Sequence, residues 1–64
     1  MSLLDYKLSQ RIAKSDYPFA AIIMTAMRQA DTQNLVYLRN AFPEIWEELQ
    51  ARYNAPGGVL EKEK

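Results

Sequence analysis

The sequence predicts an all-α protein, a small compact bundle of three to four short helices with a flexible C-terminal tail. Apolar residues recur three and four positions apart through most of the chain, and no strand-like alternation competes with that pattern. The dipeptides Tyr17-Pro18 and Phe42-Pro43 mark helix boundaries, because proline cannot continue a helix but suits its first turn. At 64 residues the chain has room for one domain, expected over residues 1–58, with residues 59–64 as a disordered tail.

The first helix is expected over residues 2–15. Ser2 and Asp5 have the spacing of a capping box, which favours a helix start at this point. The segment from Ser15 to Pro18 then ends this helix, since the residue before a proline prefers an extended backbone. The apolar stripe of this helix is narrow and consists of Leu4, Leu8 and Ile12.

The second helix, expected over residues 18–30 with Asp16 or Tyr17 before its first turn, is apolar around most of its circumference. On a helical wheel its apolar side chains fill an arc of about 200°, where a surface helix needs little more than about 100°. Such a helix requires cover on two sides, and a chain this short offers few other helices. We therefore expect a homo-oligomer whose interface includes Ala20, Met24 and Met27.

The third and fourth helices are expected over residues 32–42 and 43–53. Asp31 or Thr32 is a suitable N-cap for the third helix. The sequence leaves open whether the fourth helix is separate or a kinked continuation of the third. The predicted core comprises Leu4, Leu8, Ile12, Phe19, Ile22, Ile23, Ala26, Leu35, Leu38, Phe42, Ile45, Trp46 and Leu49.

Composition argues against several classes of function. The chain has neither His nor Cys, so we expect no structural zinc, no cofactor, no catalytic residue and no enzymatic activity. Eight basic and eight acidic residues balance, which gives no general attraction to nucleic acid or to anionic membranes. A DNA-binding helix-turn-helix is the less favoured alternative, since Arg39 is the one basic residue of the third helix. No segment has the composition of a membrane span or signal peptide, so a cytoplasmic location is expected.

Tyrosine and arginine, which are enriched at protein interfaces, are scattered along the chain. Tyr6 and Tyr37 lie off the apolar stripes of their helices and join the predicted interface, whereas Tyr53 is expected in the core. An alternative is an oligomeric sponge that binds a small nucleotide-like anion between subunits. The residues predicted for that ligand site are Tyr6, Arg11, Lys14, Arg28 and Arg39.

Three stretches carry a resemblance to known proteins. They are Asp-Tyr-Pro-Phe at residues 16–19, Ala-Phe-Pro-Glu-Ile-Trp-Glu-Glu-Leu at 41–49 and Arg-Tyr-Asn-Ala-Pro-Gly-Gly at 52–58. With them the chain resembles small accessory proteins of bacteriophages and other mobile elements. The resemblance implies a protein that binds and blocks a host component, sequesters a signalling nucleotide or forms part of a virion. The leading hypothesis is a non-enzymatic, self-associating interaction protein.

Overall fold

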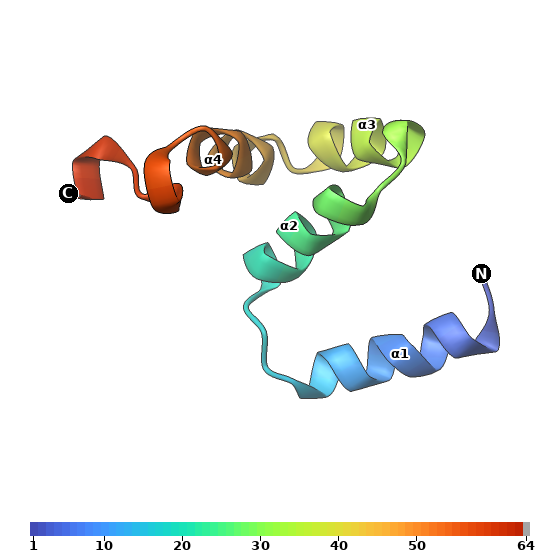
Figure 1. The fold of residues 1–64 in the computed structure, drawn as a ribbon. Helices are drawn as coiled ribbons and strands as arrows, with labels where there is room; N and C mark the ends of the chain where they lie inside the picture. The colour runs from blue at the N-terminus through green and yellow to red at the C-terminus, as the bar shows by residue number, and fades with distance from the viewer. Residues whose placement is uncertain (64) are drawn as a thin grey trace.

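Four α-helices make up most of the protein, whose computed structural model describes residues 1–63. They are followed by two short 3-10 turns, and the described residues contain no β-strand (Figure 1). This arrangement confirms the all-α prediction, and each helix end lies within two residues of its expected position. The elements are α1 (Leu3–Lys14), α2 (Phe19–Gln29), α3 (Thr32–Ala41), α4 (Pro43–Tyr53), η1 (Pro56–Gly58) and η2 (Glu61–Glu63).

Helices α2, α3 and α4 pack pairwise against one another, and α4 also packs against η1. Their shared core is small: within residues 1–63, the buried residues are Met27 of α2, 4% exposed, and Leu49 of α4, 7% exposed. The rings of Phe19 and Phe42 meet edge to face, with centroids 5.7 Å apart, where α2 approaches the α3–α4 junction. These three helices form the bundle of this protein.

Helix α1 stands apart from that bundle. It packs against none of the other helices or turns in residues 1–63, and the chain takes an open, Z-like shape in which α2 runs diagonally between α1 and the α3–α4 pair (Figure 1). The radius of gyration is 13.7 Å, compared with about 11 Å for a compact domain of this length. The predicted compact bundle therefore describes α2, α3 and α4 but not α1.

The local signals that begin helices act largely as expected. The Asp5 amide donates to Ser2 Oγ at 3.2 Å and the Ser2 amide donates to Asp5 Oδ2 at 3.1 Å, which completes the capping box of α1. Asp31 caps α3 by accepting a hydrogen bond from the Asn34 amide at 2.8 Å. Asp16 and Tyr17 precede α2 as expected, Asp16 with a left-handed backbone at φ 56°, and Pro18 takes the N-cap position without a side-chain hydrogen bond.

Helices α3 and α4 are separate, which the sequence leaves undecided. Phe42 lies between them with φ −130° and ψ 64°, outside the helical region. Its amide donates to the Leu38 carbonyl at 2.8 Å and its own carbonyl accepts from the Trp46 amide at 3.0 Å. One residue thus closes α3 and opens α4, and Pro43 follows as the first residue of the new helix.

The tail expected at residues 59–64 contains the 3-10 turn η2 within residues 59–63, while residue 64 lies outside the described residues. Arg52 of α4 donates two hydrogen bonds to the Glu63 carboxylate, at 2.8 and 2.7 Å. The same guanidinium donates to the Gly58 carbonyl at 2.8 Å and to Glu48 at 2.7 Å. These contacts hold η1 and η2 against the end of α4, whereas the sequence pattern identifies Arg52 only as a cation near a helix C-terminus.

The predicted core holds for most of its members in the bundle, although it omits Met27, and it is wrong for α1. Of the predicted members beyond α1, Leu49 is buried and eight others are half-buried. Phe19 and Tyr53, both expected in the core, are exposed because they lie at the edge of the bundle. Leu4, Leu8 and Ile12 are exposed because nothing within the described chain covers α1.

Candidate functional site

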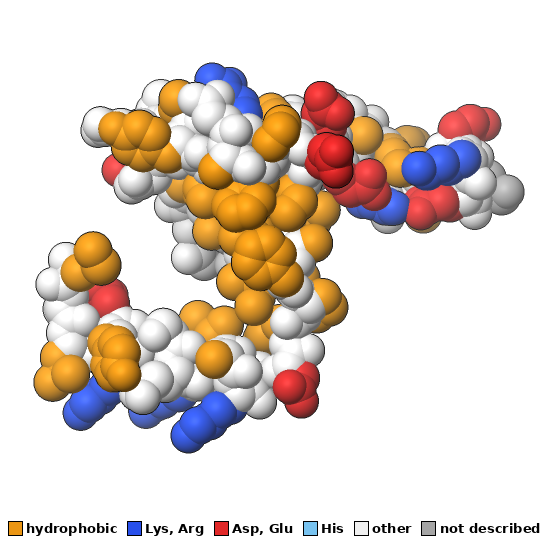
Figure 2. Space-filling model, turned by 180° about the vertical axis from the view of Figure 1, so that it is seen from behind, with side chains coloured by type: hydrophobic (Ala, Val, Ile, Leu, Met, Phe, Trp, Pro, Cys, Tyr) orange, Lys and Arg blue, Asp and Glu red, His pale blue; other side chains and the backbone are white. Residues whose placement is uncertain are grey.

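An open apolar groove runs along α2 and reaches the C-terminal end of α1. Its volume is about 450 Å³. Figure 2 shows apolar side chains gathered over the central helix, above the separate α1 arm. This feature, called here the α2 groove, is lined by Ile12, Tyr17, Ala21, Ile22, Thr25, Ala26 and Gln29.

The lining of the α2 groove offers few polar groups to a ligand. Its polar side chains are Tyr17, Thr25 and Gln29, none of them charged, and the Thr25 hydroxyl already donates to the Ala21 carbonyl of the preceding turn at 2.9 Å. Ala21 and Ala26 are small, so another backbone or a bulky apolar side chain could approach α2 closely. The chemistry of the groove therefore favours an apolar occupant over a charged small molecule.

The α2 groove lies on the opposite side of α2 from the face that the sequence predicts as an interface. Met27 is the most buried residue of the bundle, so its assignment to an intermolecular interface is wrong for this structure. Met24 is half-buried and Ala20 is exposed. Thr25 and Met27 are two residues apart, about 200° around a helix. The bundle covers the Met27 side of α2 and leaves the Thr25 side open.

Helix α1 carries a second apolar surface, which we call the α1 stripe and define as Leu4, Leu8 and Ile12. These side chains are 64%, 40% and 46% exposed, respectively. Their spacing of four residues places them on one side of the helix. Ile12 also lines the α2 groove, so the stripe begins at the groove and extends away from it toward the N-terminus.

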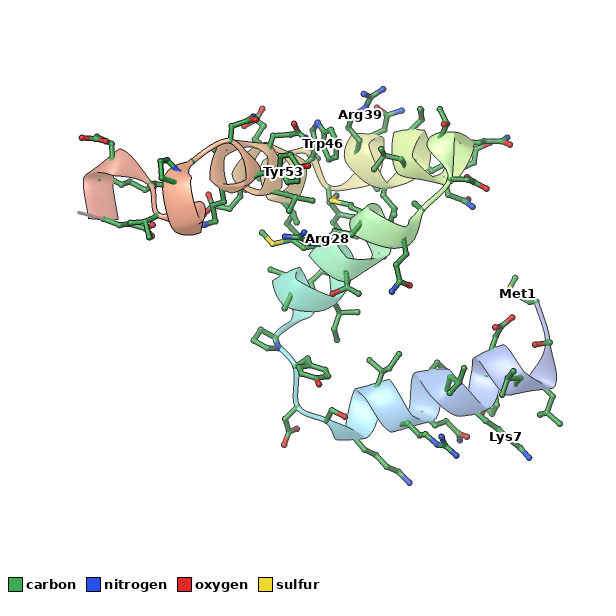
Figure 3. The ribbon with its side chains drawn as sticks, viewed as in Figure 1. Met1, Lys7, Arg28, Arg39, Trp46 and Tyr53 are labelled. Carbon is green, nitrogen blue, oxygen red and sulfur yellow. The ribbon has the colours of Figure 1, made fainter. Side chains whose placement is uncertain are left out.

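A row of basic side chains lies beside the α1 stripe. Lys7, Arg11 and Lys14 follow at intervals of four and three residues, which gathers them on one side of α1. None of the three forms a hydrogen bond or ion pair with another described side chain. Lys7 projects away from the bundle (Figure 3). Helix α1 is therefore an amphipathic, positively charged arm with no partner among residues 1–63.

The two tyrosines predicted at an interface are both exposed but lie on different arms of the molecule. Tyr6 is on α1, which packs against no other element described. Tyr37 is on α3, where its hydroxyl accepts a hydrogen bond from Gln33 Nε2 at 3.0 Å. The structure of one chain does not bring these tyrosines together.

The residues predicted for an anionic ligand are likewise dispersed. Tyr6, Arg11 and Lys14 are on α1, Arg28 is at the end of α2 and Arg39 is on α3. Arg39 and Arg28 project from different sides of the bundle (Figure 3). A ligand site made from all five residues would need more than one copy of the chain.

A second groove, which the sequence patterns do not indicate, surrounds Arg28. It has a volume of about 420 Å³ and lies between α2, α3 and α4. Arg28 forms no hydrogen bond or ion pair with the described residues. This feature, the Arg28 groove, is lined by Met27, Arg28, Leu35, Trp46, Leu49, Gln50, Tyr53 and Asn54.

None of the helices in residues 1–63 has the length and apolarity needed to cross a membrane. No group of three or more Asp and Glu side chains that could hold a metal ion occurs in the described part of the chain. No protein-family model matches the chain, and no curated protein or solved structure is significantly similar to it.

Proposed function

We propose that the chain is a non-enzymatic helical interaction protein that self-associates. The observation that carries this proposal is the separation of α1 from the bundle, with the α1 stripe exposed along its length. An isolated helix of 12 residues is marginal in water, because few intrahelical hydrogen bonds offset its nucleation cost. Contact with another surface would provide the stabilisation that the chain itself does not supply to α1.

The exposed surface of the chain supports the same proposal. The accessible surface is 5487 Å², whereas a folded monomer of this mass exposes about 4,200 Å². The difference, about 1,300 Å² per chain, exceeds the surface that one partner buries in an interface of standard size. Much of it is apolar, because α1 and the open side of α2 both lack cover.

Light scattering coupled to size-exclusion chromatography tests this proposal. Wild-type protein should elute with a mass above the 7.4 kDa of one chain. Leu8→Glu, which places a charge in the middle of the α1 stripe, should shift the protein to monomer. Gln10→Glu is the matched control, since it adds the same charge to the other side of α1 and should leave the mass unchanged.

A well-folded wild-type monomer across the micromolar range would contradict the proposal. So would equal masses for Leu8→Glu and wild type, provided that circular dichroism shows the bundle still helical. The resemblance to small phage accessory proteins supports a narrower version, in which the protein also binds and blocks a host component. In that version Leu8→Glu would abolish the block and Gln10→Glu would retain it.

The Arg28 groove favours a second candidate function, the binding of a small nucleotide-like anion. Arg28 supplies a free guanidinium for phosphate, and Trp46 and Tyr53 line the same groove with aromatic rings. A nucleotide that binds the native state must raise its melting temperature. Stabilisation by mono-, di- or cyclic nucleotides that disappears in Arg28→Gln but persists in Arg39→Gln would support this function, and no stabilisation in the wild type would exclude it.

A further inference from the structure

We propose that two copies of this chain exchange their first helices, so that the α1 stripe of each copy occupies the α2 groove of the other. The inference rests on the proposed self-association and specifies its geometry. Such an arrangement is reciprocal, as the two-fold symmetry of most homodimers requires.

The two surfaces match in length and chemistry. The α1 stripe runs from Leu4 to Ile12, and the groove face of α2 runs from Ala21 to Gln29. Both span eight residue steps, about 12 Å at 1.5 Å per residue. The stripe offers branched aliphatic side chains, while the groove offers small residues between which such side chains can insert.

The connection between the helices explains why α1 does not cover its own α2. Asp16 is left-handed, with φ 56°, and Pro18 is extended, with φ −58° and ψ 145°. The proline ring restricts rotation at Pro18 and disfavours a helical Tyr17. This short, stiff linker directs α1 away from the bundle, so that Ile12 lines the groove but Leu4 and Leu8 do not. A splayed helix on a short hinge is the arrangement from which exchange between identical chains proceeds at low cost.

Charge also favours a second copy as the occupant. Residues 1–15 contain three basic and one acidic side chain, whereas residues 16–64 contain five basic and seven acidic. The arm is therefore positive and the rest of the chain negative by the same amount, which favours the encounter of one copy's arm with another copy; the α2 groove itself is lined by uncharged residues. The excess surface, about 2,600 Å² for two chains, falls within the range of obligate homodimer interfaces.

Introduced thiols test the geometry, because the natural chain has no cysteine. Leu8→Cys and Thr25→Cys place one thiol at the centre of the α1 stripe and one at the centre of the α2 groove. Both positions are exposed in the single chain, so neither change disturbs the core around Met27 and Leu49. An equimolar mixture of the two single variants, oxidised mildly, should give chiefly the mixed Leu8–Thr25 disulfide dimer.

Gln10→Cys mixed with Thr25→Cys is the matched control and should give little mixed dimer, since residue 10 lies on the other side of α1. The double variant Leu8→Cys, Thr25→Cys should form a doubly linked dimer. An intramolecular disulfide in the double variant would overturn the exchange and show that α1 closes on its own chain.

The remaining outcomes separate this inference from the proposed function. If light scattering shows an oligomer but the mixed thiols do not link, helix exchange is wrong and self-association stands. If the wild type is monomeric, both are wrong. Binding of a monomeric wild type to vesicles of equal parts phosphatidylcholine and phosphatidylserine, lost in Leu8→Glu, would assign the amphipathic α1 to a membrane surface instead and overturn the exchange.

Discussion

Helices α1 and α4 have nearly the same length and the same apolar spacing, yet α4 packs within the bundle and α1 does not. α1 carries Leu4 and Leu8 four residues apart, and α4 carries Ile45 and Leu49 in the same way. α4 packs against α2, α3 and η1 and buries Leu49, whereas α1 packs against none of them. An apolar stripe thus indicates that a helix face needs cover, but it does not indicate whether that cover comes from the same chain.

Helices α1 and α4 also differ in how each is joined to its neighbouring helix. Phe42 connects α3 to α4 as a single residue whose amide and carbonyl both bond to the adjoining helices. Four residues, Ser15 to Pro18, connect α1 to α2, and they include the left-handed Asp16. The Phe42 junction keeps α3 and α4 in contact, whereas the linker from Ser15 to Pro18 holds α1 and α2 apart.

The largest expected effect is the loss of stability on truncating a core leucine. Leu49→Ala should lower the free energy of unfolding by about 2–5 kcal/mol, because it removes buried methyl groups and leaves a cavity. Leu4→Ala, the same change on α1, should have an effect only at concentrations where copies associate. Chemical denaturation followed by Trp46 fluorescence at several protein concentrations measures both. A concentration-independent loss of similar size in Leu4→Ala would remove the distinction between arm and bundle.

A smaller effect is expected from the helix caps. Asp31→Ala should destabilise the bundle by about 0.5–2 kcal/mol, since it deprives the Asn34 amide of its acceptor. Ser2→Ala removes the equivalent cap of α1 and, in dilute solution, should reduce helicity without moving the Trp46 transition. Circular dichroism and fluorescence on the same samples distinguish the two results. Equal shifts of the fluorescence midpoint would show that α1 folds together with the bundle.

The smallest expected effect is that of acid pH on the C-terminal turn η2, which is held to α4 by Glu63. The hydrogen bonds from the Arg52 guanidinium, with a further one from the Leu60 amide, lower the pKa of Glu63 from its usual 4.5 to about 2. The same pairing with Glu63, and then with Glu48, raises the pKa of Arg52. Because the pKa of Glu63 is lower in the folded protein, its ion pair with Arg52 stabilises the folded turn fully above about pH 4.5. This stabilisation is lost as the pH falls toward 2.

This loss should appear as a shift of the Leu60 amide resonance during an acid titration, since that amide donates to Glu63 at 3.1 Å. Glu63→Gln should produce the low-pH resonance already at neutral pH, and Glu44→Gln, at the exposed start of α4, should not. If the Leu60 amide titrated with a midpoint near 4.5 in the wild type, Glu63 would not be paired with Arg52 in solution.

Much of the secondary structure of this protein can be predicted from its sequence, whereas of the predicted site residues only Met27 and Arg28 line a groove. Ser2, Asp31 and Pro43 mark helix starts because each acts on backbone groups within a few residues. The breadth of the apolar surface on α2 predicts that the helix needs cover on two sides; the bundle covers its Met27 side and leaves the α2 groove open. The Arg28 groove and the anchoring of η2 by Arg52 were not foreseen, since each depends on residues brought together by folding.

The sequence by itself determined the helices, their boundaries and the apolar faces that they present, because hydrogen bonds and steric restrictions along one or two turns decide these features. Tertiary structure alone decided which of those faces meet. It placed Met27 in the core and left the Thr25 side of α2 open, opposite to the prediction, and it left the α1 stripe uncovered. Which faces meet depends on the directions in which the linkers send whole helices, and the periodicity of an individual helix carries no information about those directions.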